Sequence, residues 1–364
     1  MSNEAKGLGQ QESTGYARLS KTWIAVWALV GVNALWGLSF PIMKSLNLQL
    51  EDHFGLEHAS VPMSMSVAFS AGMIGLRFLL SFGLLFLISP GLFRNASMTE
   101  WRIGAIVGLF FYFGLVLQVI GLATIPASRS GFLTSLTAVF TPILSALLFR
   151  KSISSNVILG VGIALLGVAI LTGLLEFEQG TVRIASDALS RWTIGDTLTT
   201  FGSVLFTGQL MLVDHYGKRV NSTAITPGMF LIVVVASGLT FLSLYQSSLW
   251  SFSGGASLGL ADWGRLFFSP VFASFLVFLA LFCSVLAFVG MNRYQPHVSA
   301  VQASVIYSCE PVFASAWALF LPGWMAMIEA RIGYPNELLS LPLLLGGALV
   351  LVANVVALWP RKGN

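Results

Sequence analysis

The chain has 364 residues, of which 56% are hydrophobic and only 9% are charged, and its mean hydropathy is +0.83. A folded soluble surface needs far more charge than this, so the composition excludes a soluble domain of this length. The net charge of +4 comes from basic residues in pairs at the ends of apolar blocks, which is typical of membrane topology and not of nucleic-acid binding. The composition therefore predicts an all-α membrane protein.

The N-terminal segment precedes the first apolar block and is rich in Gly, Ser and Gln. Such a composition cannot bury enough apolar surface to fold, so we expect residues 1–21 to form a disordered cytoplasmic tail. The apolar block after it is too long for a cleaved signal peptide and lacks a small-residue cleavage site near its end. We therefore expect this block to be the first membrane span.

The apolar blocks predict ten transmembrane helices, because a helix needs roughly 20 apolar residues to cross a bilayer core. The expected spans are residues 22–46, 66–89, 102–123, 127–150, 153–175, 195–215, 223–246, 270–292, 297–321 and 338–360. They fall into two repeats of five helices, residues 22–175 and 195–360. An external polar linker at 176–194 joins the repeats, and a cytoplasmic tail at 361–364 follows.

The two halves resemble each other in sequence. PASRSGFLTSLTAVFTP ends at Pro142, QPHVSAVQASVIYSCEP ends at Pro311, and the same spacing aligns Ser130 with Ser299. Five is an odd number, so the second repeat must cross the membrane in the opposite orientation. Inverted repeats are typical of transporters, in which the substrate site lies near the midplane between the copies.

The basic residues predict the orientation of the spans. With the N-terminus inside, most of the 19 Lys and Arg residues lie in the inner segments. This excess places both termini in the cytoplasm and indicates a multi-pass protein of the cytoplasmic (inner) membrane.

Glu310 is the strongest functional candidate. Between residues 298 and 321 the other ionisable side chains are one tyrosine and one cysteine, and a carboxylate at such depth is usually functional or partnered. Pro311 follows it and cannot donate a hydrogen bond to the Tyr307 carbonyl, so we expect a helix break here, as at Pro142. Either Glu310 takes up and releases a coupling proton, or it stays fixed and bonds the freed backbone groups.

Arg77 is the second charge deep in a predicted span. Long apolar runs on both sides make snorkelling to the surface a poor solution for its charge. Its guanidinium either faces an aqueous cavity, where it meets an anionic solute group or Glu310, or ties helix carbonyls together.

Further polar and aromatic side chains are candidates for a cavity wall. Tyr307 shares the helical face of Glu310, and Asn33 and Trp36 share a face of the first span. Such a face forms either a cavity wall or ordinary packing, and packing is the commoner. For Gln118 and Gln209, at mid-membrane depth, an interhelical hydrogen bond is favoured over a ligand contact.

No catalytic pattern accompanies these residues. The four histidines lie at span ends or in loops, and the sequence has no HExxH or paired-aspartate intramembrane motif. We therefore expect no enzyme activity, no cofactor and no metal site.

Several segments together resemble one known family, the EamA type of the drug/metabolite transporter superfamily. They are NALWGLSFPIMK from Asn33, GLRFLL around Arg77, LQVIGLATIPASRSGFLTSLTAVFTPIL from Leu117 and SAVQASVIYSCEPVFA from Ser299. The resemblance implies two inverted five-helix repeats around a central cavity, alternating access, and usually efflux of small metabolites or xenobiotics.

The sequence therefore predicts a secondary transporter, more an exporter than an importer, of a small metabolite, amino-acid-like or drug-like solute. Without an ATP site, its energy would come from a solute gradient or from a gradient of protons or another coupling ion. An uncoupled facilitator and a non-transporting sensor or partner subunit are the alternatives. A sensor needs a folded cytoplasmic domain, for which no inner loop is long enough. The expected partners are the solute and the lipid bilayer, a homodimer is left open, and no nucleic acid is expected.

Overall fold

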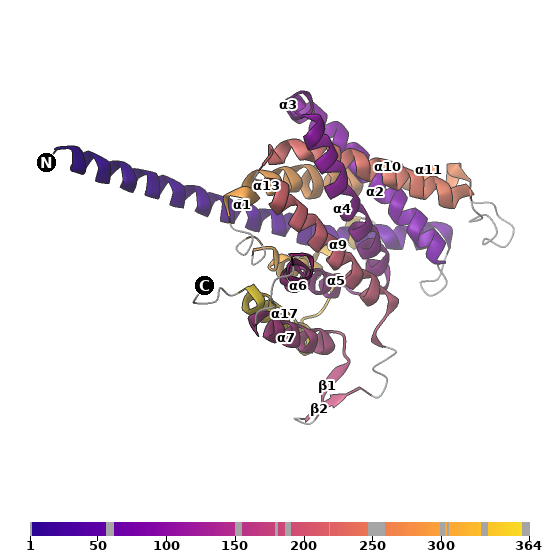
Figure 1. Cartoon of the computed structure of the whole chain (residues 1–364). Coiled ribbons are helices and arrows are strands. Elements are labelled where there is room, and N and C mark those ends of the chain that lie inside the picture. Colours follow the sequence, from indigo (N-terminus) through magenta and orange to yellow (C-terminus); the bar gives the residue numbers. More distant parts are fainter. Residues whose placement is uncertain are drawn as a thin grey trace.

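The chain folds as an all-α membrane protein with one small β-hairpin (Figure 1). The computed structural model describes residues 2–55, 62–149, 155–178, 181–185, 191–217, 219–246, 259–298, 303, 306–328 and 334–358. The predicted tail at 361–364, and Ser299, which aligns with Ser130, lie outside these residues.

The first half of the chain is helical. Its helices are α1 (Ser2–Phe54), α2 (Met63–Ile88), α3 (Pro90–Arg94), α4 (Met98–Thr124), α5 (Ala127–Thr134), α6 (Thr137–Phe149) and α7 (Ser155–Leu171). Local chemistry defines where α4 begins. The Glu100 backbone N–H donates to the Ser97 hydroxyl at 3.3 Å, and the Ser97 N–H donates to the Glu100 carboxylate at 2.7 Å. This capping box satisfies two N–H groups that would otherwise lack partners.

The second half follows a hairpin of β1 (Leu175–Glu178) and β2 (Thr181–Ile184), which pair antiparallel with Leu175 opposite Ile184. The helices after the hairpin are α9 (Ile194–Gly217), η2 (Ser222–Ile225), α10 (Thr226–Gln246), α11 (Leu260–Phe267), α12 (Pro270–Phe278), the π-helix η4 (Leu279–Leu286), α13 (Ala287–Tyr294), η5 (Gln295–His297), α15 (Glu310–Ala318), α16 (Leu321–Ile328) and α17 (Leu341–Leu358).

Within the described residues, six helical stretches are long and apolar enough to cross a membrane. They are Trp23–Phe54, Met63–Ile88, Met98–Thr124, Ala127–Leu148, Ser222–Leu244 and Pro270–His297. A seventh results if α15 and α16, which meet at 47°, form one bent span, and α7 and α17 are apolar but shorter. The chain is therefore a multi-pass membrane protein, whereas the count of ten spans stays a prediction.

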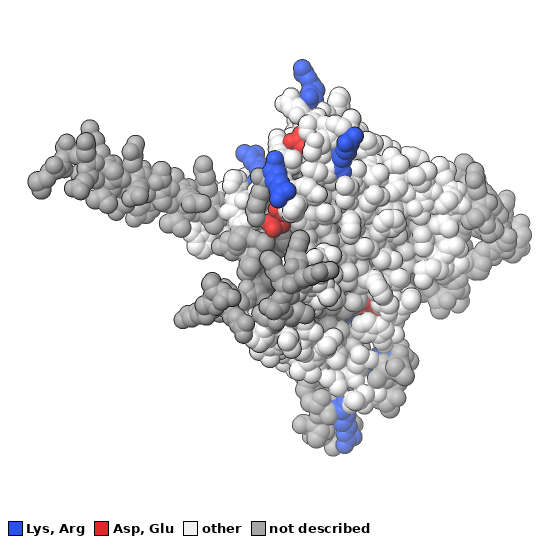
Figure 2. Space-filling model, viewed as in Figure 1, with Lys and Arg blue, Asp and Glu red and all other residues white. Residues whose placement is uncertain are grey.

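The charged side chains fit this arrangement. Figure 2 shows Lys, Arg, Asp and Glu gathered near α3 and α13 and near the hairpin, with a mostly uncharged surface between them. Charged groups belong in water and an uncharged belt belongs in lipid. The visible face is therefore that of a membrane-crossing bundle.

Two helix boundaries differ from the prediction. The backbone of α1 is helical from Ser2 to Phe54, and so includes most of the segment predicted as a disordered tail. No proline precedes Pro41, and each added residue gains one hydrogen bond from a helix already formed. Helix α7 ends at Leu171, before the predicted 175, because Gly173 adopts a left-handed φ of 75° that ends a helix.

Glycines allow α4 to pack closely against α9 and α10. A Cβ on Gly108 would lie 2.7 Å from the Met229 carbonyl oxygen of α10, and one on Gly195 of α9 would lie 2.7 Å from the Gly121 carbonyl oxygen. Neither contact is sterically allowed, so both approaches require glycine. This packing places α4 at the centre of the molecule, where it faces an internal cavity.

Candidate functional site

An internal cavity of about 80 Å³ lies between helices of both halves. Its lining comes from α1, α2, α4, α5, α6, α9, α13, α15 and the segment before α15, and consists of Trp36, Ser39, Phe40, Arg77, Phe111, Leu115, Gln118, Thr134, Thr137, Phe206, Gln209, Leu210, Phe288, Met291, Tyr307 and Glu310. Pockets for drug-sized ligands measure about 300–1,000 Å³. The cavity is therefore smaller than such a pocket and has room for a few water molecules.

Six of the sixteen lining residues are aromatic, and several of them stack on one another. The ring of Trp36 lies 5.4 Å from that of Phe288 and 5.7 Å from that of Tyr307, and Phe111 lies 4.9 Å from Phe288. These distances are in the range where ring pairs stabilise each other beyond simple burial. The result is a preorganised apolar wall with flat ring faces.

Asn33 does not contribute to this wall. It is fully buried, and its Nδ2 donates to the Leu29 carbonyl at 2.7 Å, one turn back along α1. Trp36 lines the cavity, but the wall does not extend to Asn33.

Glu310 is the first residue of α15 and lines the cavity. Within the described residues its carboxylate makes no hydrogen bond and no ion pair, so the expected bonds to freed backbone groups are not formed there. The helix begins after a turn at Ser308 and Cys309, with Pro311 in the first turn, where its missing N–H costs nothing. The expected break thus lies just before Pro311.

The break in the fourth predicted span lies elsewhere than expected. The turn falls at Ser135 and Leu136, and Pro142 lies inside α6. The Ser135 hydroxyl donates to the Phe132 carbonyl at 2.8 Å, which offers the backbone an alternative to the helical hydrogen bond. A serine turn therefore separates α5 from α6, and the proline does not.

Arg77 lines the cavity, yet its donors are turned toward protein. Its Nε donates to the Ser284 hydroxyl at 2.8 Å, one Nη to the Cys283 carbonyl at 3.1 Å and the other to the Met43 sulfur at 3.5 Å. The residue is 3% exposed and forms no ion pair with Glu310. The guanidinium thus ties α2 to the π-helix η4.

The two glutamines differ in their contacts. Gln118 Nε2 donates to the Thr134 hydroxyl at 2.7 Å and so links α4 to α5, which is the interhelical bond favoured from the sequence. Gln209 lines the cavity and is buried, but its amide makes no hydrogen bond in the described part of the chain. Tyr307 donates to Gln295 Oε1 at 2.8 Å, so its hydroxyl is also engaged.

Sequence reasoning missed several lining residues, among them Phe111, Phe206 and Phe288. They lie on helices that are apolar on nearly every side, so periodicity does not distinguish a cavity face from a lipid face. Only their contacts in three dimensions reveal them.

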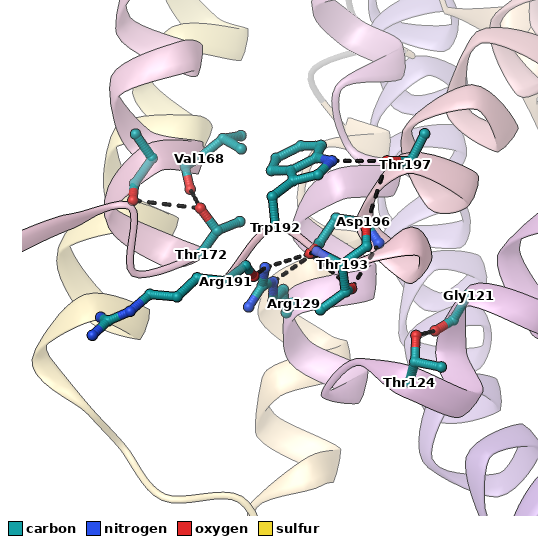
Figure 3. Close-up of polar contacts among 11 residues, drawn as sticks. Gly121, Thr124, Arg129, Val168, Thr172, Arg191, Trp192, Thr193, Asp196 and Thr197 are labelled. Carbon is teal, nitrogen blue, oxygen red and sulfur yellow. Dashed lines mark hydrogen bonds and ion pairs between the residues drawn. The ribbon is translucent and has the colours of Figure 1, made fainter. Parts of the chain in front are cut away.

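A polar cluster joins α5 to α9 (Figure 3). We call Arg129, Arg191, Thr193 and Asp196 the α5–α9 cluster. Arg129 donates through Nε to Asp196 Oδ1 at 2.6 Å and through Nη2 to the Arg191 carbonyl at 3.1 Å, and the Thr193 N–H donates to Asp196 Oδ2 at 2.8 Å. Bidentate pairing of a guanidinium with a carboxylate is both strong and directional. The first turns of α5 and α9 are therefore held together.

The N-terminus of α5 has two more anchors. The Ala127 N–H donates to Glu337 Oε1 at 2.7 Å, and the Ser128 hydroxyl donates to Glu337 Oε2. A carboxylate at this end of a helix is favoured by the unpaired N–H groups and the helix dipole. Lys44 Nζ donates to the Ile125 carbonyl at 2.6 Å, which adds α1 to the same junction.

Comparisons with known proteins agree with the membrane architecture. Residues 23–173 match the EamA-like transporter family. An uncharacterized transporter of Archaeoglobus fulgidus is 22% identical over 220 residues, which cover 60% of this chain and 61% of that protein. The uncharacterized transporter YyaM of Bacillus subtilis is 24% identical over 214 residues, which cover 57% and 61% of the two chains. The matched region thus spans less than two thirds of either relative.

One solved crystal structure aligns with 89% of this chain and 96% of its own, at 17% identity and a TM-score of 0.44.

Proposed function

We propose that this chain, whose residues 23–173 match the EamA-like transporter family, is a secondary transporter of a small metabolite, amino-acid-like or drug-like solute. One observation carries the proposal. An internal cavity, walled by aromatic rings and lined from both halves of the chain, contains a carboxylate that makes no hydrogen bond or ion pair in the described structure. An acid without a partner among membrane-spanning helices is costly, and a transport role accounts for it.

The proposed architecture is two inverted repeats of five spans, residues 22–175 and 195–360, around this cavity. Trp36, Gln118 and Thr134 belong to the first repeat, and Gln209 and Glu310 belong to the second. A site contributed by both copies suits alternating access, in which the copies rock against each other around a fixed site. The proposed location is the cytoplasmic membrane, with both termini inside and export as the direction.

Six of the lining residues have a proposed part in this cycle. Glu310 exchanges a proton or pairs with a charged solute group, and Trp36 and Tyr307 form the wall against an apolar solute body. Gln118 holds Thr134 in place in the cavity lining. Arg77 supports the packing of α2 on η4 and leaves solute binding to its neighbours.

The α5–α9 cluster closes one end of the cavity in this proposal. Arg129 and Asp196 lie at the first turns of α5 and α9, and these two helices contribute Thr134 and Gln209 to the lining further along. By the orientation predicted from the basic residues, this end faces outward. The described conformation is then closed to the outside, and opening it requires the cluster to separate.

The proposal can be tested by transport into vesicles. Metabolite profiles of cells with and without the protein would identify the solute, and the purified chain in proteoliposomes would then receive an imposed proton gradient. We expect uphill accumulation of the solute that a protonophore abolishes. Transport that ignores the gradient would indicate an uncoupled facilitator. No movement of any solute that differs between the cells would reject transport.

A further inference from the structure

A short irregular segment, residues 334–340, lies between α16 and α17 in the chain and is bonded to α5. Most of the segment is exposed, and Leu338 is 82% exposed, whereas Glu337 is half-buried. The Glu337 carboxylate accepts hydrogen bonds from the Ala127 N–H at 2.7 Å and from the Ser128 hydroxyl. The segment is therefore attached to the first turn of α5 through a charged side chain.

The backbone of Glu337 binds a second helix. The Glu337 N–H donates to the carbonyl of Ala318, the last residue of α15, at 2.9 Å. A helix leaves its first N–H groups and its last carbonyls without partners inside the helix. Glu337 supplies such a partner at the N-terminus of α5 and another at the C-terminus of α15. We call Glu337, Ala127, Ser128 and Ala318 the Glu337 clasp.

The Glu337 clasp joins two helices that both reach the central cavity. Helices α5 and α15 pack directly against each other, since a Cβ on Gly131 would lie 3.0 Å from the Ala314 Cβ and 3.3 Å from the Pro311 Cα. Thr134 at the end of α5 and Glu310 at the start of α15 line the cavity. At about 1.5 Å per residue, the clasp lies about 11 Å along α5 and about 12 Å along α15 from these residues. The clasp is therefore outside the cavity lining but connected to it through two short helices.

Neighbouring residues fix the segment in place. The Gly323 N–H of α16 donates to Asn336 Oδ1 at 2.7 Å, and the Tyr334 hydroxyl donates to the Pro41 carbonyl of α1 at 3.4 Å. The ammonium group of Lys44 lies 5.7 Å from the centre of the Tyr334 ring, within the range of a cation–π contact. These contacts hold the clasp carboxylate at one position facing α5, so movement of α5 relative to the segment breaks the carboxylate bonds.

We propose that the Glu337 clasp is a latch between the two repeats, closed in this conformation and opened in each transport cycle. The inference rests on the alternating access proposed above. In that architecture α5 belongs to the first repeat, and α15 and Glu337 belong to the second, so rocking of the repeats separates Glu337 from Ala127 and Ser128. Arg129 of the same turn pairs with Asp196 of α9, which is also in the second repeat (Figure 3). The first turn of α5 is thus latched to the second repeat at two places.

Reversible cross-linking tests whether the latch must open. In a variant that combines Ser128→Cys with Glu337→Cys, a short bis-methanethiosulfonate reagent joins the two positions, and a reducing agent releases them. We expect the cross-link to stop solute transport in proteoliposomes and its release to restore transport. Each single cysteine variant, treated in the same way, should keep transport and controls for the native Cys283 and Cys309. Undiminished transport by the cross-linked protein, with the cross-link verified by mass spectrometry, would overturn the proposal.

A second measurement does not depend on transport. Glu337→Gln removes the charge of the clasp, so a cysteine in place of Thr137, which lines the cavity, should react about tenfold faster with an impermeant thiol reagent added outside. Glu100→Gln is the matched control. It removes a similar carboxylate at the start of α4, which accepts from the Ser97 N–H at 2.7 Å and from the Asn221 N–H at 3.0 Å. By the predicted orientation α4 begins at the inner face, so labelling from outside should stay unchanged.

The outcomes separate the latch from the transport proposal. If the unaltered protein moves no solute, the proposed function fails, whereas the labelling rates still test the latch. Ser128→Ala removes one donor and keeps the charge of Glu337, so it should raise the labelling rate less than Glu337→Gln does. It also replaces Glu337→Gln in the test if that variant does not fold. An unchanged labelling rate in the folded variant would overturn the latch.

Discussion

Arg129 of α5 and Asp196 of α9 form a bidentate ion pair, with 2.6 Å between Nε and Oδ1 and 2.5 Å between Nη2 and Oδ2. The Asp196 carboxylate is fully buried and also accepts hydrogen bonds from the backbone N–H and the hydroxyl of Thr193. Removing one partner from such a pair leaves a buried charge uncompensated. In the proposed architecture the pair connects the two repeats, so its separation is a step in opening the cavity.

We predict that Asp196→Asn lowers the free energy of unfolding by about 3–5 kcal/mol, because the Arg129 guanidinium loses its counter-charge. Thermal unfolding in detergent measures this effect. Arg219→Gln removes an exposed charge at a turn and serves as the control, with little change expected.

The same variant tests the closure of the cavity. A cysteine in place of Thr137, which lines the cavity, should react faster with a membrane-impermeant thiol reagent added outside when Asp196→Asn is present. An unchanged labelling rate, with the protein still folded, would show that the cluster does not close the outer side.

Glu310→Gln keeps the shape of the side chain and removes its charge. If Glu310 couples transport to protons, the variant should abolish accumulation against a gradient and leave solute exchange between the two sides intact. Proteoliposomes loaded with unlabelled solute and given labelled solute outside measure both. Asp52→Asn, at an exposed position, is the control. Undiminished uphill transport by Glu310→Gln would reject coupling through this residue.

Much of the membrane architecture could be predicted from the sequence, because the hydrocarbon core demands long apolar helices. Every predicted span contains a helix in the described residues, and residues 23–173 match the EamA-like transporter family, which the sequence resembles. Glu310 stood out because a lone acid in an apolar run is rare.

The arrangement of the site could not be predicted in the same way. Phe111 and Phe288 lie on helices whose faces look alike in sequence, and no local signal pairs Arg129 with Asp196 from another part of the chain. The sequence predicts the helix break at Pro142 because proline disrupts helices more strongly than serine does. In the structure the break lies at Ser135, and Pro142 lies inside α6. These features depend on packing between segments distant in sequence.

Gln209 and Gln118 allow a matched comparison. Gln118 bonds Thr134, so Gln118→Leu should cost about 1 kcal/mol of stability, whereas Gln209 has no such bond and Gln209→Leu should leave stability nearly unchanged. If the free amide contacts solute, Gln209→Leu should raise KM more than it lowers kcat. Transport kinetics and unfolding curves of both variants distinguish a solute contact from a structural role. A large loss of stability for Gln209→Leu would mean that the Gln209 amide has a structural role.

Arg77→Met should destabilise the protein and reduce transport of every solute to a similar degree. The substitution removes the donors to the Ser284 hydroxyl and the Cys283 carbonyl, which are then left buried without them, at about 1–3 kcal/mol for each group. Arg77→Lys retains the charge, but an ammonium group cannot reach both partners as the rigid guanidinium does. Its stability should therefore fall between that of the unaltered protein and that of Arg77→Met. Unfolding curves, together with uptake of an anionic and a neutral solute, provide the test. A selective loss for the anionic solute, at unchanged stability, would mean that the guanidinium binds solute directly.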